Sequence, residues 1–388
     1  MIRVLTLSTL FPDVRRPVFG PFVERQTLGI AAHPDVEVRV VASIGLPPTP
    51  FSRLPRYAAQ RELPLWEMWK GLPVYRPRFR HIPATKGRFD AASLARDVQP
   101  VLEMIREDFP FDVIDAEFFF PDGPAAITMG KALGVPVSIK ARGADIHFWG
   151  SNPPTKAQVI NAGQCADGML AVSAALKHDM VALGMPEDRI TVHYTGVDLE
   201  QFAPRDRSAT KDRLGVVGPL IATVGALIER KSQALVIEAL AAIPSAKLVL
   251  IGQGPDREKL YAQAKKRGLT DRVIFTGSLP QQDIAIWLGA ADVMCLPSAS
   301  EGLANAWVEA LACGTPIVIA DVGGARELID RPEAGRLVPR TAAAIAEAIN
   351  AVIAAPPLQV DVRKMAERFT WARNTQTLYE HFSALIRK

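Results

Sequence analysis

Two glutamates in one stretch of the chain have the clearest chemical potential. Glu301 and Glu309 stand eight positions apart, with Asn305 halfway between them. The apolar spacing from Leu303 to Ala312 predicts a helix, so a rise of about 1.5 Å per residue separates the two carboxylates by about 12 Å on one face. Carboxylates that far apart cannot act on one atom, but they can hold the two ends of an extended ligand. The alternative is a capping Glu301 and a surface Glu309.

The expected start of this helix adds an anion-binding element. Gly302 allows close backbone approach, and the free N–H groups of a helix N-terminus favour negative charge. A nucleotide diphosphate sugar fits this layout, with its sugar at one carboxylate, its diphosphate at the helix start and its ribose hydroxyls at the other carboxylate.

Alternating strands and helices must position these residues. Segments rich in Val and Ile form two series, separated by helical stretches, which is the pattern of parallel sheets built from βαβ units. The expected strands are 3–7, 36–41, 113–116, 135–139, 168–172 and 190–194, then 220–224, 247–251, 273–276, 293–296 and 316–319.

A polar run rich in helix breakers lies between the two series. We therefore expect two Rossmann-like, doubly wound α/β domains at 1–202 and 219–361, a linker at 203–218, and a helical segment at 362–388 able to pack back on the first domain. Two such domains facing each other would form an interdomain cleft between the carboxyl ends of their sheets, where open α/β sheets bind ligands.

The charge of the chain is concentrated in one place. The 388 residues include 45 Lys and Arg against 41 Asp and Glu, a net charge of +4. Segment 53–88 holds nine cations against Glu62 and Glu67, interleaved with aromatic and aliphatic residues. This mixture indicates a surface that meets phosphates or an anionic membrane; the alternative is a solvated loop. Confinement to one segment, without a known motif, argues against nucleic acid as a partner.

Cysteine and metal-binding patterns exclude other classes. Cys165, Cys295 and Cys313 are far apart, which argues against a disulfide framework or a zinc site and suits a reducing compartment. The chain has no Asp-x-Asp and no His/Cys cluster, so we expect no metal. Its apolar runs are all too short to form a membrane-spanning helix. We therefore expect a cytoplasmic protein that attaches to a membrane, if at all, as a peripheral protein on its cytoplasmic face.

The segment from Ser300 to Ala320 resembles the signature of retaining glycosyltransferases of family four (glycosyl transferases group 1, GT-B fold), and most closely the polysaccharide-building members. The resemblance covers most of the chain, through Pro17–Phe22 with Gly20 where a glycine pair is common, Phe120–Gly123, Val172–Leu176, Gly196–Asp198 followed by Phe202 and Pro204, Val224–Lys231, Ile251–Pro255 and Ala291–Ser298.

The resemblance implies catalytic roles for four residues. Glu301 would contact the donor sugar, and Lys231 would neutralise the diphosphate leaving group. The family often has an arginine where this chain has Ala226, so Arg230 would supply the second cation. Arg142 replaces a histidine common in the family; always protonated, it can bind phosphate or acceptor oxygens but cannot be a general base. No protein nucleophile emerges, which suits the same-face mechanism proposed for the family.

Further residues take binding roles by the same resemblance. Glu309 would bind the donor ribose. The other donor-binding candidates are Asn305, Gly302, Leu303, Ala304, Gly225, Gly252, Gly254, Gly277, Leu279 and Gly20. The acceptor-binding candidates are Asp145, Glu117 and Asp122, although Asp145 equally suits a cap for the turn that follows it.

The function implied is a metal-independent, retaining hexosyltransferase. It would need no cofactor and would take a nucleotide diphosphate sugar as co-substrate. Its acceptor would be a hydroxyl of a saccharide, most simply a lipid-linked one, in surface polysaccharide or glycolipid biosynthesis. Two alternatives stay open: an isomerase of the same architecture, similar to nucleotide-sugar 2-epimerases, and a non-catalytic protein that binds nucleotide sugars.

Overall fold

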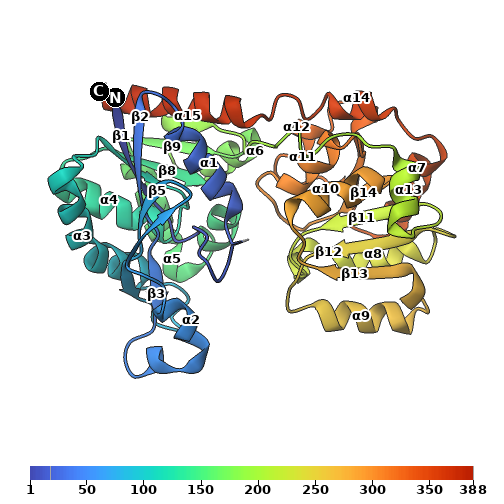
Figure 1. Cartoon of the computed structure of the whole chain (residues 1–388), viewed down its shortest axis with the longest axis horizontal. Helices are drawn as coiled ribbons and strands as arrows, with labels where there is room; N and C mark the ends of the chain where they lie inside the picture. The colour runs from blue at the N-terminus through green and yellow to red at the C-terminus, as the bar shows by residue number, and fades with distance from the viewer. Residues whose placement is uncertain (18, 388) are drawn as a thin grey trace. The chain divides into compact units, whose positions relative to one another are not determined.

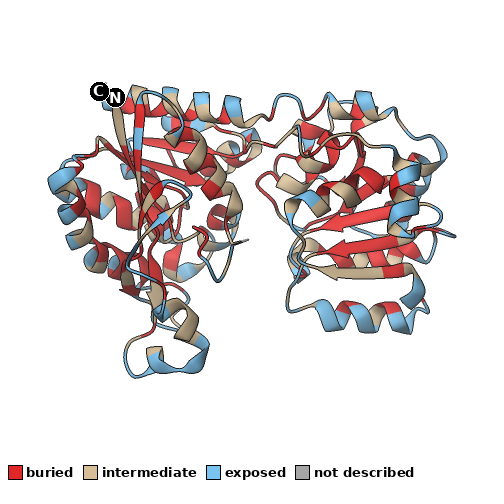
Figure 2. Cartoon of the chain, in the orientation of Figure 1, coloured by how far each residue is buried: buried red, intermediate tan, exposed pale blue. Residues whose placement is uncertain are grey.

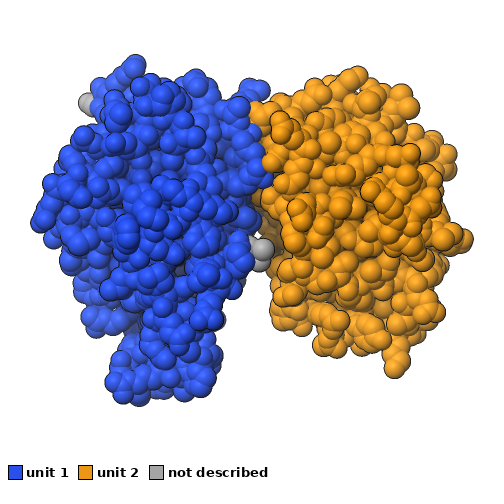
Figure 3. All heavy atoms as spheres, in the orientation of Figure 1, with its two compact units in different colours: residues 1–195, 371–388 blue, residues 196–370 orange. Residues whose placement is uncertain are grey.

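The computed structural model describes residues 1–17 and 19–387; Val18, in the predicted glycine loop, and Lys388, in the predicted C-terminal segment, lie outside the described residues. The chain forms two compact units, coloured separately in Figure 3. Unit 1 is Met1–Thr195 together with Trp371–Lys388, and unit 2 is Gly196–Thr370. Each unit has its own sheet with helices packed on it (Figure 1).

Unit 1 is built on an eight-stranded sheet of order β10-β9-β8-β7-β1-β2-β5-β4. The neighbours pair in parallel, except for the antiparallel β4–β5 hairpin at one edge. The strands are β1 (Ile2–Leu7), β2 (Val36–Val41), β4 (Trp66–Trp69), β5 (Leu72–Tyr75), β7 (Val113–Ala116), β8 (Val137–Ala141), β9 (Gly168–Ala171) and β10 (Ile190–Val192).

Helices and one small sheet complete unit 1. The helices are α1 (Pro21–Ala31), α2 (Ala58–Arg61), α3 (Asp90–Asp108), α4 (Asp122–Leu133), α5 (Pro153–Cys165), α6 (Ala174–Ala182) and α15 (Trp371–Ile386). The small sheet pairs β3 (Ile44–Leu46) with β6 (Arg78–Arg80). Strands β4, β5 and β6 all lie within segment 53–88, for which the sequence suggested a surface or a solvated loop.

Unit 2 has a six-stranded parallel sheet of order β13-β12-β11-β14-β15-β16, the 3-2-1-4-5-6 order of Rossmann folds. The strands are β11 (Leu220–Val224), β12 (Lys247–Ile251), β13 (Val273–Gly277), β14 (Val293–Leu296), β15 (Ile317–Ala320) and β16 (Gly335–Val338). The helices are α7 (Arg207–Leu214), α8 (Gln233–Leu240), α9 (Arg257–Lys266), α10 (Gln281–Ala290), α11 (Asn305–Ala312), α12 (Ala325–Leu328), α13 (Ala342–Ala354) and α14 (Gln359–Arg363). The predicted class, two Rossmann-like α/β domains, is confirmed.

The segment expected to be a linker, 203–218, belongs to unit 2 and contains α7. The Asp206 side chain accepts from the Ala209 N–H at the start of this helix, and Gly215 ends it with φ 66°. The chain enters and leaves unit 2 side by side, because the Val197 N–H donates to the Phe369 carbonyl at 2.7 Å.

Both cores consist of strand residues and the helix faces that cover them, as the buried colour of Figure 2 shows. The last helix, α15, packs against α1 and inserts Leu378, Phe382 and Leu385 into the core of unit 1, beside Val4 and Val38. In the described part of the chain, no helix combines the length and apolar character needed to cross a bilayer.

Candidate active site

Three charged side chains meet where the strands of unit 2 end. Lys231 and Arg230 lie in a single helical turn, η5 (Glu229–Lys231), between β11 and α8. Lys231 Nζ is 2.5 Å from Glu301 Oε1, and Arg230 Nη1 is 3.3 Å from Glu301 Oε2. The Glu301 side chain is 8% exposed, so its charge is held by two cations in a nearly dry position. The structure therefore brings together three of the four predicted catalytic residues.

Glycines allow the backbone loops around this cluster to pack closely. A Cβ on Gly252, at φ 145°, would lie 2.0 Å from the Gly225 carbonyl oxygen, and one on Gly323 would lie 2.1 Å from the Glu301 carbonyl oxygen. On Gly254 it would lie 2.2 Å from the Leu227 oxygen. The loops after β11, β12, β14 and β15 therefore pack on one another, and the Lys231–Glu301 pair lies among them.

The predicted helical spacing between the two glutamates does not hold. Helix α11 begins at Asn305, and Ala304 is extended with φ −71° and ψ 121°. The Gly302 carbonyl accepts from the Gly324 N–H at 2.8 Å, which ties this stretch to the next loop rather than to a helix. The helix from which the separation of the two carboxylates was predicted therefore does not extend back to Glu301. Glu309 is half-buried on α11.

The other donor candidates of unit 2 lie on the same loops. Gly302, Leu303 and Ala304 are buried in front of α11, whose N-terminus has no side-chain cap, and Asn305 is its first residue. Gly277 ends β13 and accepts from the Gly252 N–H at 2.9 Å; the half-buried Leu279 follows it. Gly225 follows β11, and a Cβ there would lie 3.7 Å from Lys231 Cε.

Arg142, the fourth predicted catalytic residue, and Gly20 belong to unit 1. Arg142 Nε donates to the Glu117 carbonyl at 2.8 Å, its guanidinium pairs with the Glu117 carboxylate, and it lies 4.6 Å from the centroid of the Phe22 ring. Its side chain is only 7% exposed. Gly20 precedes α1 with φ 64°, and a Cβ there would lie 1.8 Å from the Leu10 oxygen.

Glu117 is part of a buried polar network in unit 1. Its carboxylate accepts from Gln26 as well as from Arg142, and Lys140 donates to the Gln26 side-chain oxygen. Lys140 also lies 2.8 Å from His193 Nδ1. Burial lowers the pKa of Lys140 to about 7 and puts the pKa of His193 well below its usual value. A neutral His193 can then accept the lysine hydrogen bond.

Asp145 and Asp122 are fully buried. The Asp145 carboxylate accepts the backbone N–H groups of Phe119, Arg142, Gly143 and Ile146, which is the geometry of a turn cap. Asp122 Oδ2 accepts the Thr9 N–H at 2.9 Å, while its Oδ1 has no hydrogen-bond partner among the described residues. Burial raises the pKa of both carboxyls, that of Asp122 to about 7. Both carboxyls thus support the fold of the loops at the ends of the unit 1 strands.

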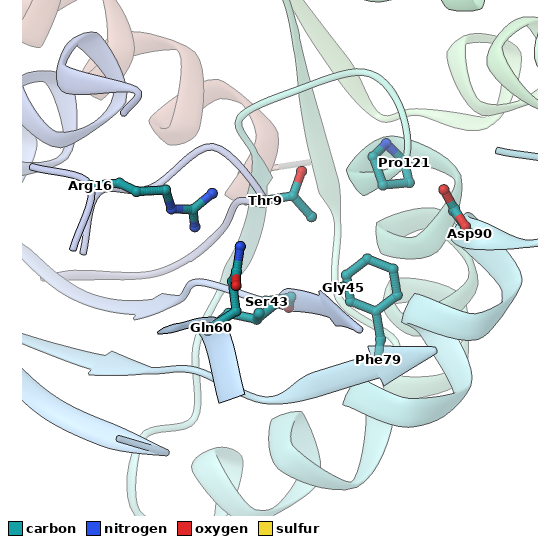
Figure 4. A pocket seen from close by; sticks show the side chains of 9 residues that line it. Thr9, Arg16, Ser43, Gly45, Gln60, Phe79, Asp90 and Pro121 are labelled. Carbon is teal, nitrogen blue, oxygen red and sulfur yellow. The ribbon is translucent and has the colours of Figure 1, made fainter. Parts of the chain in front are cut away.

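A pocket in unit 1 contains polar residues that the sequence reasoning missed. It measures about 230 Å³ and is lined by Thr9, Arg16, Ser43, Ile44, Gly45, Gln60, Phe79, Asp90 and Pro121 (Figure 4). Ser43 Oγ and Gln60 Oε1 are buried and have no hydrogen-bond partner among the described residues, a state that costs about 1–3 kcal/mol per group. The sequence signal was weak: Thr9 and Ser43 each stand two residues beyond an expected strand.

Within residues 1–17 and 19–387, no group of three or more His, Cys, Asp or Glu side chains is placed to hold a metal ion.

Comparison with known proteins identifies the class to which this fold and this loop cluster belong. The model of the glycosyl transferases group 1 matches residues 206–369, and the model of glycosyltransferase family 4 matches residues 31–201. The D-inositol 3-phosphate glycosyltransferase of Kribbella flavida is 30% identical over 71% of this chain and 72% of its own length. The chain therefore belongs to this glycosyltransferase family, as the resemblance predicted.

Individual relatives and solved structures match nearly the whole length of this chain. The putative teichuronic acid biosynthesis glycosyltransferase TuaC of Bacillus subtilis is 26% identical over 100% of this chain and 99% of its own length. Among solved structures, sucrose-phosphate synthase from Thermosynechococcus elongatus matches with a TM-score of 0.82 at 19% identity, covering 100% of both chains. HepE from Anabaena in complex with UDP matches with 0.74 at 20%, covering 99% of this chain and 100% of its own. The GT-B fold is thereby confirmed.

Proposed function

We propose that this glycosyltransferase moves a hexose from a nucleotide diphosphate sugar to a hydroxyl of a saccharide acceptor, with retention of configuration and without a metal. One observation carries the proposal: Lys231 and Arg230 meet at Glu301, among loops that close glycine contacts hold together. The solved structures of HepE in complex with UDP and with UDP-glucose support a nucleotide sugar as donor.

The proposed chemistry assigns each charge a task. Negative charge develops on the departing diphosphate during transfer, and a fixed cation stabilises this charge most in the transition state. Lys231 and Arg230 are the cations, and Glu301 holds them in position and contacts the donor sugar. Glu309 binds the ribose hydroxyls. Arg142 of unit 1 binds phosphate or acceptor oxygens, and the leaving phosphate itself accepts the acceptor proton.

The acceptor belongs to surface polysaccharide or glycolipid biosynthesis. The relative named for teichuronic acid biosynthesis supports a polysaccharide, and the relative named as a phosphatidylinositol monomannoside mannosyltransferase supports a lipid-linked saccharide. Cytoplasmic residence, with peripheral attachment to an anionic membrane through segment 53–88, fits such an acceptor. Seven of its nine cations are exposed, together with Leu54, Leu65, Trp66, Met68 and Ile82. Arg76 is excluded from this surface because it is buried against Glu67.

A donor panel tests the proposal. The protein is incubated with UDP-, GDP- and ADP-sugars and a membrane glycolipid extract, and nucleotide release is measured with and without EDTA. We expect one donor class to turn over, equally well in EDTA, and NMR of the product to show the anomeric configuration of the donor. Absence of both binding and turnover for every donor would contradict the proposal. A product of inverted configuration would contradict the retaining mechanism, and loss of turnover in EDTA would contradict the independence of metal.

The same panel separates the two alternatives. An isomerase converts a nucleotide sugar without any acceptor, so NMR of the donor alone would show a new sugar. A binding protein would hold the donor tightly and release no nucleotide.

A further inference from the structure

The pocket of unit 1 lies where a sheet of this type binds ligands. Thr9 follows β1, Ser43 follows β2, and Pro121 follows β7, so three neighbouring strands contribute to it from their carboxyl ends. Asp90 opens α3, and Gln60 reaches in from α2 (Figure 4). The lining thus comes from elements far apart in sequence that converge on one side of the sheet.

The unpartnered atoms show what the pocket lacks. Ser43 is 5% exposed, and its hydroxyl has no hydrogen-bond partner among the described residues; the same holds for the buried Gln60 oxygen. A hydroxyl can donate and accept, whereas an amide oxygen accepts only. A ligand that satisfies both atoms must therefore carry at least one O–H or N–H donor.

The two charged side chains on the wall, Asp90 and Arg16, already have partners. Both Asp90 oxygens lie 3.0 Å from His81 Nδ1, and Arg16 forms a pair with Asp13 through two nitrogens at 2.9 and 2.8 Å. The phenyl ring of Phe79, 6% exposed, lines the pocket beside Gly45. A volume of about 230 Å³ is below the usual range for drug-sized ligands, so it suits one ring rather than a nucleotide.

We propose that this pocket binds one uncharged pyranose ring of the acceptor, with Ser43 and Gln60 recognising its hydroxyls and Phe79 packing on its C–H face. The inference rests on the proposed function only in assigning the bound sugar to the acceptor. A pyranose combines hydroxyls that donate and accept with an apolar face, which is the chemistry that the wall presents. The acidic residues Asp145, Glu117 and Asp122 then support the unit rather than contact this sugar.

Binding without turnover tests the pocket directly. Saturation-transfer NMR on the full chain is run with methyl glycosides of glucose, galactose, mannose and N-acetylglucosamine, and with glucuronate as the charged comparison. The variants are Ser43→Ala and Gln60→Leu; the matched controls are Ser208→Ala and Gln376→Leu, whose side chains lie outside the pocket. Unfolding curves confirm that all four variants are folded.

We expect at least one neutral glycoside to bind, with affinity about fivefold lower in each pocket variant and unchanged in the controls. Binding by none of the neutral glycosides, equal loss in the controls, unchanged affinity in the pocket variants, or binding of glucuronate alone would overturn the inference. Because no donor is present, a failed donor panel with glycoside binding intact would refute the proposed function but leave the pocket standing.

Discussion

Lys231 illustrates how a single residue would act in transfer. Its side chain is 13% exposed and pairs with Glu301, and Arg230 provides a second cation on the same carboxylate. Removing Lys231 therefore leaves Glu301 paired with Arg230, so the fold can survive the loss of one of the two cations that we propose stabilise the leaving group.

The first prediction compares Lys231→Ala with Glu309→Ala. Losing a charge that acts mainly in the transition state should lower kcat about 100-fold or more, whereas losing a ribose contact should raise the donor KM by about tenfold with a smaller change in kcat. Steady-state kinetics on the donor that turns over measures both. The control is Lys259→Ala, an exposed lysine on α9. Wild-type kinetics in both variants would contradict the site assignment.

Asp122 allows a prediction about pH. Burial raises its pKa from 3.8 to about 7, so the folded state holds the proton more tightly than the unfolded state. Its contribution to stability is complete below the unfolded pKa and is lost as the pH rises through the folded one. Relative to Asp122→Asn, the wild type should lose about 3 kcal/mol of unfolding free energy between about pH 5 and pH 8.5.

Urea unfolding of both proteins across this range gives the difference curve. The comparison cancels the titration of the other groups, because they are shared by the two proteins. A difference that stays constant with pH would mean that Asp122 titrates alike in the folded and unfolded states.

At the scale of elements, the loops of unit 2 depend on glycine contacts that a methyl group would break. Gly252 and Gly268 both have positive φ, 145° and 67°, but only Gly252 has backbone within reach of a Cβ. We expect Gly268→Ala to cost about 1–2 kcal/mol through backbone strain, and Gly252→Ala to cost at least about 3 kcal/mol and to weaken donor binding. Urea unfolding and donor titration check both; equal costs would show that the loops move apart freely.

The edge hairpin of unit 1 allows a prediction about membranes. Trp66 and Met68 on β4 are 51% and 54% exposed, beside exposed cations of segment 53–88. We expect vesicles with anionic lipid to bind the protein in a salt-dependent way, and the double variant Trp66→Ser, Met68→Ser to bind about tenfold less. Val217→Ser, from the 81% exposed Val217 of unit 2, is the control. Equal binding to neutral vesicles, or none at all, would contradict the prediction.

Sequence patterns predicted the main strands well and the loops poorly, for a physical reason. Runs such as 220–224 are apolar because their strands are buried on both faces, so the strand can be recognised from a few consecutive residues. The short β3–β6 pair depends on partners that are distant in sequence. The extended stretch before α11 is held by Gly324, and the linker turned out to contain a capped helix. Contacts of this kind cannot be predicted from any single short stretch of the sequence.

The site was predictable to the same degree. The Glu301–Glu309 spacing and the Arg230–Lys231 pair are visible in sequence, but the meeting of both cations at one carboxylate requires two loops from distant parts of the chain. The pocket of unit 1 was not predictable, because Ser43 and Gln60 become notable only once a side-chain oxygen of each is seen to be buried without a partner among the described residues.

At the scale of the whole molecule, the chain leaves unit 1 after Thr195 and returns to it at Trp371. The two family models divide at 201 and 206, close to the same point, but the second ends at residue 369, before α15. The last helix is therefore part of the first unit's core, although it follows the whole of the second in sequence. Weakening the packing of α15 should therefore destabilise unit 1, and not unit 2, which immediately precedes α15 along the chain.

Phe382→Ala tests this division of the chain. Phe382 is fully buried among the apolar residues of unit 1, so truncation should cost about 3–5 kcal/mol, mainly in unit 1. Leu240→Ala, at a fully buried position in the core of unit 2, is the reciprocal variant, with an expected cost of about 2–5 kcal/mol. Hydrogen exchange in mild denaturant should show faster exchange in β1, β2 and α1 for the first variant and in β11, β12 and α8 for the second. Equal acceleration of both units by either change would show that the molecule unfolds as one cooperative body and that α15 stabilises the whole rather than the unit in which it lies.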